Sequence, residues 1–381
     1  MDREATHRQA DGRHRDAGID LFKALAVVFV VVHHVVDCGV SMPETPGFAL
    51  RELRYGLHGL VYACVDMFAL ATGYLCVTSR KTAGRVLRPW LQTVAIGLAG
   101  TALCRAAGAE TEASDWLRAA FPVVTGEYWY VTAYFALCCL MPLLNAGARA
   151  TDAAVFRKSL ATLALAAGVS SVLFPGDPFV LKHGYGFAWM LVMYLAGAYW
   201  RLHVAAPPRP VPCAAVAIAA SHAYLLPSLG KRLLPGAAGA WSGGLDVTPY
   251  TSPATVAVAL AVFGLCRNVR DPGSFARKAL SSLSGASLGI YLWLVHPVFW
   301  RAFWRPGLSR VVVATPWQFV WKTALAAVCA LAAAWTLESL RAHLFRLAEG
   351  ALPYHGSEAD AAKAAAHSAA VATAKTDCCR Q

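Results

Sequence analysis

A lysine and a histidine occupy the two ends of the first apolar stretch, "GIDLFKALAVVFVVVHH". An α-helix turns about 100° per residue, so the roughly 1,100° between Lys23 and His34 return to within about 20° of the same face. Asp20 lies three residues before Lys23 on that face, and Asp37 follows His34 by about one turn. We therefore predict that Asp20, Lys23, His34 and Asp37 form one polar stripe about 25 Å long.

This stripe carries the groups that acid–base chemistry needs. Ionisable side chains inside a membrane span are costly, and they usually face a bundle interior or a water-filled cavity. A histidine with a pKa near neutrality can accept the proton of a hydroxyl nucleophile. For Lys23 and Asp20 alone, extension toward the lipid headgroups explains the sequence equally well, but the alignment of the whole stripe favours a buried functional face. His33 is rotated by about 100° from it, and we expect His33 to be dispensable.

The rest of the chain consists largely of apolar segments suited to a membrane. Its 381 residues are 57% hydrophobic and 15% charged, whereas soluble domains carry about 25% charged residues. A helix needs about 20 apolar residues to cross a bilayer, and by that criterion about ten segments qualify. They are 19–40, 57–78, 86–106, 128–146, 156–174, 185–203, 211–229, 251–267, 284–303 and 317–346. The sequence therefore predicts an all-α, polytopic transmembrane helical bundle.

The basic residues indicate how these spans are oriented. They are concentrated in alternate loops, which face the cytoplasm by the positive-inside rule, so we expect both termini to be cytoplasmic. One loop departs from the rule, because Arg301, Arg305 and Arg310 follow the ninth segment on the predicted outer side. The net charge of +12 lies largely in these loops. We therefore expect the lipid bilayer as a partner and no nucleic acid.

Two polar segments flank the predicted membrane region, residues 18–346. We expect residues 1–17 and 347–381 to be disordered and cytoplasmic, and the second of them carries Cys378 and Cys379 near its end. Cysteines within apolar segments behave as small hydrophobic residues, and no spacing of cysteine with histidine indicates a metal site. We expect neither a metal nor a bound cofactor.

Five motifs follow one another along the predicted spans. They are Lys23-X10-His34, "VDMFALATGYL" (65–75), "GRVLRPW" (84–90), "EYWYVTAYFALCCLMPLL" (127–144) and "SLGIYLWLVHPVF" (287–299). In this order they resemble the acyltransferase-3 family, whose members are integral membrane enzymes that modify cell-surface polysaccharides and related glycans. The chain departs from the family pattern in having Lys23 in place of the more usual arginine and Thr72 in place of serine. His296 also lies two positions later than usual after Tyr291. The resemblance covers approximately residues 15–345.

The resemblance implies a role for several residues. His34 would be the catalytic base or acyl relay, and Lys23 would bind the donor or stabilise developing negative charge. Arg85 and Arg88 would hold the phosphates of a coenzyme A donor, although topology explains this cytoplasmic charge equally well. The candidates for contacting the acceptor or lining the cavity are Asp20, Asp66, Glu127, Trp129, Tyr291 and His296. For this last group, a structural or interfacial role explains the sequence equally well.

The activity implied is that of an O-acyltransferase in a bacterial-type inner (plasma) membrane. It would transfer an acyl group, with acetyl favoured, from acyl-coenzyme A to a sugar hydroxyl of a surface polysaccharide or its lipid-linked precursor. A homo-oligomer is compatible with the sequence. The acceptor hydroxyl and the side of the membrane on which transfer occurs stay open.

Three other classes of protein are alternatives. A proton-coupled transporter or flippase also uses buried lysine, aspartate and histidine, although the chain has no internal repeat of the kind common in such carriers. A membrane-bound O-acyltransferase of an unrelated type would be centred on His296 in place of His34. A non-catalytic membrane sensor has little in its favour.

Overall fold

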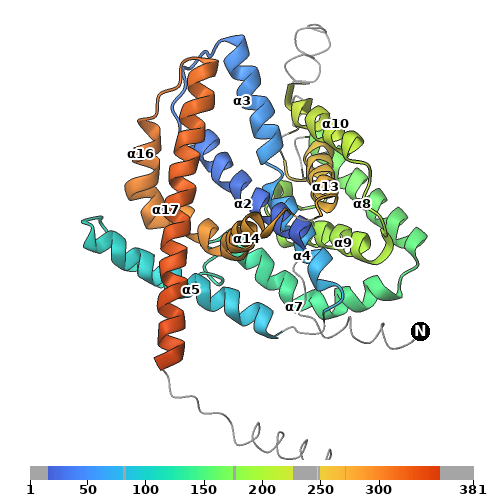
Figure 1. Ribbon diagram of the computed structural model, residues 1–381, viewed down its shortest axis with the longest axis horizontal. Coiled ribbons are helices and arrows are strands. Elements are labelled where there is room, and N and C mark those ends of the chain that lie inside the picture. Colours follow the sequence, from blue (N-terminus) through green and yellow to red (C-terminus); the bar gives the residue numbers. More distant parts are fainter. Residues whose placement is uncertain are drawn as a thin grey trace, which may run out of the picture. The chain divides into compact units, whose positions relative to one another are not determined.

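The computed structural model (Figure 1) describes residues 16–79, 83–174, 177–225, 247, 249–270 and 272–351. In chain order its elements are α2 (Ala17–Cys38), α3 (Phe48–Val61), α4 (Cys64–Cys76), α5 (Ala83–Ala106), α6 (Ala113–Ala120), α7 (Trp129–Ala150), α8 (Ala153–Leu173), the 3₁₀ turn η1 (Lys182–Gly184), α9 (Phe187–His203), α10 (Pro210–Ser221), the 3₁₀ turn η2 (His222–Leu225), α13 (Pro253–Arg267), α14 (Ser274–Leu294), α15 (Pro297–Phe299), the π turn η3 (Trp300–Trp304), α16 (Arg305–Ser309) and α17 (Pro316–Ala351). The elements described are thus helical, apart from an isolated β-bridge between Ser41 and Val312. This confirms the all-α class.

The chain divides into two units, Met1–Glu338 and Ser339–Gln381. The candidate functional site lies within the first unit. Most of the two termini for which we expect disorder, including Cys378 and Cys379, lies outside the described residues.

The structure has fewer candidate membrane spans than the sequence predicted. Among the described residues, five segments are long and apolar enough to cross a bilayer, and one bent pair adds a sixth. They are Ala17–Asp37, Phe48–Cys76, Trp129–Ala150, Ala153–Leu173, Pro316–Leu347 and the bent pair Ser274–Leu294 with Pro297–Ser309.

The prediction of about ten spans was wrong because apolar composition overstates helix length. The helices α9, α10 and α13 have 17, 12 and 15 residues, fewer than the roughly 20 that a span needs. Helix α5, with 24 residues, is long enough, but among the described residues it is not one of the segments apolar enough to cross a bilayer. The cytoplasmic location of the termini stays a prediction.

Helix α2 begins at a defined cap and packs closely on α13. The Asp16 carboxylate accepts a hydrogen bond from the Gly18 backbone N–H at 3.0 Å, as an N-cap residue does. A Cβ atom added at Gly18 would lie 2.4 Å from the carbonyl oxygen of Cys266. Glycine is therefore required where the two backbones meet, and this contact fixes the start of α2 against the bundle.

Helices α4 and α9 approach each other through a reciprocal pair of glycines. A Cβ atom at Gly73 would lie 1.8 Å from the Tyr194 carbonyl oxygen, and one at Gly197 would lie 2.0 Å from the Leu70 carbonyl oxygen. Small residues allow this backbone contact between helices in membranes. The pair holds α4, which forms one wall of the site described below, against the bundle.

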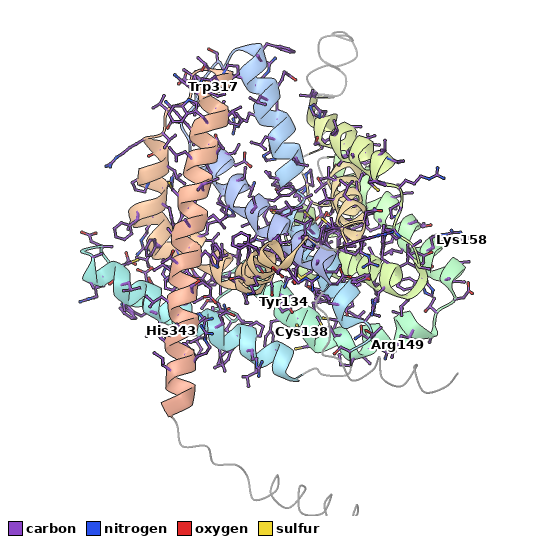
Figure 2. The ribbon with its side chains drawn as sticks, in the orientation of Figure 1. Tyr134, Cys138, Arg149, Lys158, Trp317 and His343 are labelled. Atoms are coloured by element: carbon purple, nitrogen blue, oxygen red, sulfur yellow. The ribbon has the colours of Figure 1, made fainter. Side chains whose placement is uncertain are left out.

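Helix α7 provides a second wall and is anchored at its end. Tyr134 and Cys138 lie one turn apart on α7 (Figure 2), and Cys138 is fully buried. Arg149, in the last turn, donates a hydrogen bond to the Val77 carbonyl oxygen at 2.6 Å. This bond ties the end of α7 to the residue that follows α4.

The chain bends by 59° between α14 and the segment that begins at Pro297. Proline lacks an amide N–H and disfavours helical geometry in the residue before it, so α14 stops short of His296. The His296 side chain then accepts a hydrogen bond from the Phe299 N–H at 3.3 Å and caps the next helical turn. The segment that we predicted as the ninth span is therefore broken at this histidine.

Candidate functional site

A cavity of about 620 Å³ lies among α2, α4, α5, α7 and α14. Most of the residues that line it are apolar or aromatic, and Lys23, His34, Thr72, Gln92 and Ser284 add polar groups. Small-molecule sites typically have volumes of about 300–1,000 Å³ and this mixture of apolar walls with a few polar groups. The cavity is therefore the candidate binding site of the first unit.

The cavity is elongated, and its two ends differ chemically. Lys23 and His34 both line it, and they are separated by about 16 Å of rise along α2. We call the part formed by Lys23 and Ser284 the lysine end. We call the part formed by His33, His34 and Tyr250 the histidine end. The predicted stripe thus has its lysine and its catalytic histidine candidate on the wall of one cavity.

His34 is held in the tautomer that a general base needs. Its Nδ1 lies 2.8 Å from the carbonyl oxygen of Val30, and a carbonyl can only accept. In the neutral ring the proton is therefore on Nδ1, and Nε2 keeps the basic lone pair. The ring also makes edge contacts with Trp300 at 5.8 Å and with His33 at 5.0 Å between centroids.

His33 also lines the cavity, although its rotation on the helix places it away from the predicted stripe. Its Nδ1 lies 2.8 Å from Asp37 Oδ2, and His58 Nδ1 on α3 lies 2.6 Å from the same oxygen. Asp37 Oδ2 therefore contacts two histidines. His33 reaches it from one helical turn earlier on α2, at i,i+4 spacing, and His58 reaches it from α3. Both neighbouring histidines of α2 thus belong to the histidine end, and Asp37 lies behind the cavity wall.

The other two acidic candidates on these helices bond to neighbouring helices. Asp20 is buried and accepts a hydrogen bond from the Ser284 hydroxyl at 2.8 Å, which joins the start of α2 to α14. Asp66 is fully buried and accepts a hydrogen bond from Trp189 Nε1 at 2.9 Å. Neither of them is among the residues that line the cavity. Their positions fit a supporting role behind Lys23 and within α4.

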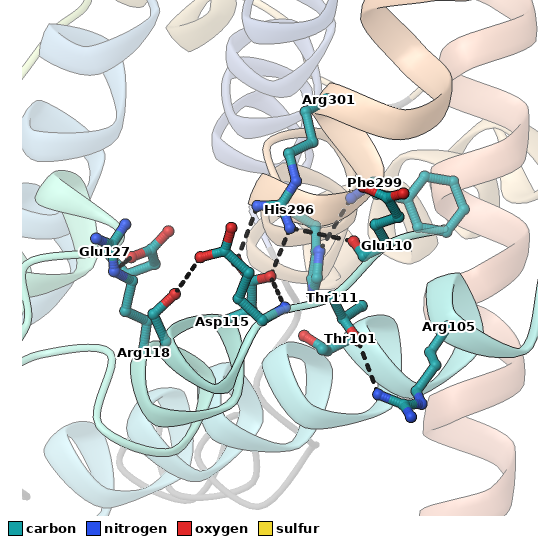
Figure 3. Close-up of polar contacts among 12 residues, drawn as sticks. Thr101, Arg105, Glu110, Thr111, Asp115, Arg118, Glu127, His296, Phe299 and Arg301 are labelled. Carbon is teal, nitrogen blue, oxygen red and sulfur yellow. Dashed lines mark hydrogen bonds and ion pairs between the residues drawn. The ribbon is translucent and has the colours of Figure 1, made fainter. Parts of the chain in front are cut away.

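Glu127 and Trp129 line the cavity beside Tyr128. Glu127 faces Arg118, whose Nε lies 3.7 Å from Glu127 Oε2 (Figure 3). The Trp129 ring contacts the Tyr185 ring at 5.0 Å between centroids. The predicted pair from the Trp-Tyr motif therefore lies at the cavity, with an acidic group and an aromatic surface side by side.

An aromatic cluster that we did not predict surrounds the histidine end. The rings of Tyr62 and Tyr250 stack at 4.3 Å with an 8° interplanar angle, and Tyr185 meets Tyr250 at 4.8 Å. The hydroxyls of Tyr62 and Tyr185 lie 2.7 Å apart. Burial raises the pKa of the Tyr250 hydroxyl well above its usual range, so this group stays protonated. The members come from distant parts of the chain, and no spacing in the sequence signals their meeting.

The two late candidates, Tyr291 and His296, have different positions. Tyr291 lines the large cavity and meets Tyr130 edge-on at 5.8 Å. His296 is buried, is not among the residues that line this cavity, and lies 3.0 Å through Nε2 from the Gly97 carbonyl oxygen. Its Nδ1 accepts from the Phe299 N–H within the bend (Figure 3). Both ring nitrogens are therefore used, and Nε2 ties the bend to α5. This geometry fits a structural histidine.

The bend also brings Arg301 to Asp115. The guanidinium makes two contacts with the carboxylate, Nη1 to Oδ1 at 2.8 Å and Nη2 to Oδ2 at 2.5 Å (Figure 3). This pairing holds the pKa of Asp115 below its usual range. One basic residue of the loop that departs from the positive-inside rule is thus neutralised by an acid.

The two arginines predicted to hold donor phosphates are not placed on the cavity wall. The Arg88 side chain is exposed on α5, and the Arg85 side chain lies outside the described residues. Pro89 and Gln92, which follow on the same helix, do line the cavity, and Gln92 Nε2 donates to Glu338 Oε1 at 3.0 Å. Arg88 therefore lies one residue before the α5 part of the wall.

The helices and the cavity define a multi-pass membrane protein with an internal site suited to acid–base chemistry. A family model described as an acyltransferase domain matches residues 16–338. The chain belongs to the acyltransferase-3 family and is an acyltransferase, as its motifs predicted. No curated protein and no solved structure matches the chain.

Proposed function

We propose that this protein is a membrane O-acyltransferase that moves an acyl group from acyl-coenzyme A to a sugar hydroxyl. Acetyl is the favoured acyl group, and the acceptor is a cell-surface polysaccharide or its lipid-linked precursor. The observation that carries the proposal is the single elongated cavity that has Lys23 and His34 on one wall. A volume of about 620 Å³ leaves room for an acyl thioester arm together with a sugar ring.

The proposed reaction starts with a sugar hydroxyl at the histidine end. His34 Nε2 takes the hydroxyl proton while the sugar oxygen attacks the thioester carbonyl carbon, forming a C–O bond. The tetrahedral intermediate then collapses, the C–S bond breaks, and the coenzyme A thiolate leaves. The proton on His34 passes to that thiolate, which restores the neutral imidazole. The bond from Nδ1 to Val30 holds the ring in the required tautomer throughout.

Lys23 acts at the other end of the same cavity. Its ammonium group attracts the anionic parts of the donor at the entry, as a point charge does. In the orientation that the loop charges predict, this end faces the cytoplasm, where acyl-coenzyme A is made. A variant of the mechanism has His34 carry the acyl group briefly as an acyl-imidazole before the sugar attacks. Both variants need a free Nε2 and therefore predict the same tautomer.

The aromatic surface at the histidine end supports a sugar as acceptor. The apolar faces of a sugar ring pack against tryptophan and tyrosine rings, and Trp129 and Tyr250 line the cavity here. Glu127, which lines the same region, can accept hydrogen bonds from sugar hydroxyls. The acceptor site is thus proposed opposite the donor entry.

The test uses membranes from cells that produce the full chain. They are supplied with acetyl-coenzyme A that carries the label in its acetyl group. The label should move to surface glycan or its lipid-linked precursor, and mild alkali should release it because the product is an ester. His34→Ala should abolish the transfer, whereas His203→Gln, which changes a histidine near the end of α9, should not. Full transfer by a folded His34→Ala protein would contradict the proposed role of His34.

The transporter alternative gives a different result in the same experiment. A carrier would move glycan or a small molecule across the membrane without covalent change, and no label would leave coenzyme A. Absence of label on every glycan fraction, with transport intact, would therefore overturn the proposed function.

A further inference from the structure

Two histidines and an aspartate converge where the end of α2 meets α3. His33 Nδ1 and His58 Nδ1 lie 2.8 and 2.6 Å from Asp37 Oδ2, and the three ligand atoms all lie within 4.8 Å of one another. The side chains are partly buried, with exposed fractions of 12%, 15% and 17% for His33, His58 and Asp37. We propose that His33, Asp37 and His58 form a binding site for a divalent transition-metal ion, with zinc as the best match.

The contacts inside this cluster fit a shared cation. A histidine N–H that donated to Asp37 would align with the carboxylate oxygen. Yet His33 Nδ1 and Asp37 Oδ2 are buried atoms that make no aligned hydrogen bond with any described residue. A cation gives each of these lone pairs a partner. In a tetrahedral zinc site, ligand atoms about 2.1 Å from the metal lie roughly 3.4 Å apart. The two histidine nitrogens, at 2.8 and 2.6 Å from Asp37 Oδ2, would therefore each move outward by somewhat under ~1 Å to hold the ion.

The choice of ligands points to a class of metal. Imidazole nitrogen suits zinc and neighbouring transition metals, whereas calcium and magnesium prefer sites made of oxygen. Two histidines and one carboxylate are also the protein ligands of many catalytic zinc sites, which keep a further position for water or substrate. Because His33 also lines the cavity, the site borders the histidine end.

Two neighbouring side chains, Arg54 and Tyr62, hold the proposed ligands in position, as residues in the outer shell of a metal site do. Arg54 Nη2 lies 3.8 Å from Asp37 Oδ1, the oxygen that does not face the histidines. The Tyr62 ring stacks on the His58 ring at 4.8 Å with a 24° interplanar angle. Such partners fix the orientation of metal ligands. The carboxylate and one imidazole are thus oriented before an ion arrives.

The sequence spacing did not indicate a metal, because the third ligand comes from another helix. His33 and Asp37 are spaced i,i+4 on α2 and share a face, but His58 is on α3. A bound ion would fasten these two helices together. It would also fix the His33 ring, whose centroid lies 5.0 Å from that of His34. The proposal stands on this geometry and does not depend on the identity of the acyl acceptor.

The test measures metal directly. The full-length protein is purified through a tag without histidine, and its metal content is measured by mass spectrometry. Metal-free protein is then titrated with Co²⁺, whose visible absorption reports nitrogen and oxygen ligands. Wild-type protein should bind about one ion per chain. Co²⁺ affinity should fall at least tenfold, a loss on the scale of removing a metal's supporting groups, in both His58→Gln and Asp37→Asn.

The control is His203→Gln, which removes an imidazole from α9 and should bind as wild type does. Elution volume and circular dichroism check that each variant is folded, and added Zn²⁺ should raise the thermal midpoint of wild type but not of the ligand variants. Equal binding by wild type and His58→Gln would overturn the proposal, as would wild-type protein that takes up neither ion. Failure of acyl transfer with intact metal binding would instead contradict the proposed function alone.

Discussion

The substitution His34→Asn separates the chemistry of His34 from its role in packing. In the structure, His34 Nδ1 donates to the Val30 carbonyl oxygen at 2.8 Å. The asparagine side-chain amide branches from the same place and can donate to the same carbonyl. It has no basic nitrogen at the position of Nε2. The variant therefore removes proton transfer and leaves the local hydrogen bond in place.

The expected magnitudes follow from these two functions. Loss of a general base lowers kcat by roughly 10²–10⁴-fold, which corresponds to about 2.7–5.4 kcal/mol at 1.36 kcal/mol for each factor of ten. Loss of the hydrogen bond to Val30 would cost about 1 kcal/mol of unfolding free energy. His34→Asn should therefore lose activity with little change in stability. His34→Ala should lose a similar amount of activity, and its unfolding free energy should also fall by about 1 kcal/mol because the bond to Val30 is lost.

The assay follows release of the coenzyme A thiol and acyl transfer to glycan by detergent-solubilised protein. A thermal unfolding curve in the same detergent gives the stability. His33→Asn is the matched comparison, since it changes the neighbouring ring while leaving the Val30 bond and Nε2 of His34 intact, and it should retain more activity. Activity of His34→Asn within tenfold of wild type would refute the reasoning, because no group at that position could then act as the base or carry the acyl group.

Three further predictions follow from the same structure. Lys23→Met should raise the KM for acyl-coenzyme A by roughly tenfold, the scale of a lost charged hydrogen bond. Lys23→Arg, which keeps the positive charge, should have a KM close to that of wild type. An unchanged KM in Lys23→Met would show that Lys23 does not bind the donor. His296→Ala should lower the thermal midpoint, since it leaves buried partners unpaired at a cost of about 1–3 kcal/mol, while the kcat of the folded protein stays within a few-fold. A loss of kcat as large as that of His34→Asn would make His296 the reaction centre. Gly73→Ala should destabilise the protein by roughly 1–3 kcal/mol through overpacking, because its Cβ would lie 1.8 Å from the Tyr194 carbonyl oxygen. Gly147→Ala, with no atom within 4 Å of its Cβ, is the control, and equal unfolding curves for the two would contradict the close contact.

The placement of Lys23 and His34 could be predicted from the sequence because both residues are on one helix. Helix rotation alone puts them on one face, and no knowledge of the neighbouring helices is needed. The same reasoning placed His33 about 100° away from this face, yet His33 also lines the cavity. A helix face in contact with a site is at least about 100° wide, so it can include two adjacent residues where the cavity is broad.

The parts that could not be predicted depend on contacts between distant segments. Tyr62, Tyr185 and Tyr250 meet from the junction of α3 and α4 and from the segments before α9 and α13. No period or spacing connects them. Similarly, apolar content cannot distinguish a helix that crosses the bilayer from a shorter apolar helix such as α10. Span counting therefore overestimated the number of spans.

Lys23 and His34 come from a single helix, whereas the aromatic rings at the histidine end come from several separate segments. This difference bears on which acceptors the enzyme can take. The proposed catalytic histidine, His34, and Lys23 belong to one helix, so their separation is set by helix geometry and would hold for any acceptor. The aromatic rings of the histidine end come from separate segments, and each can change without moving Nε2 of His34. An enzyme built in this way can keep one donor and one reaction while its acceptor varies. Substitutions at Trp129 or Tyr185 should accordingly alter which glycan is acylated, whereas substitutions at Lys23 should alter the use of the donor.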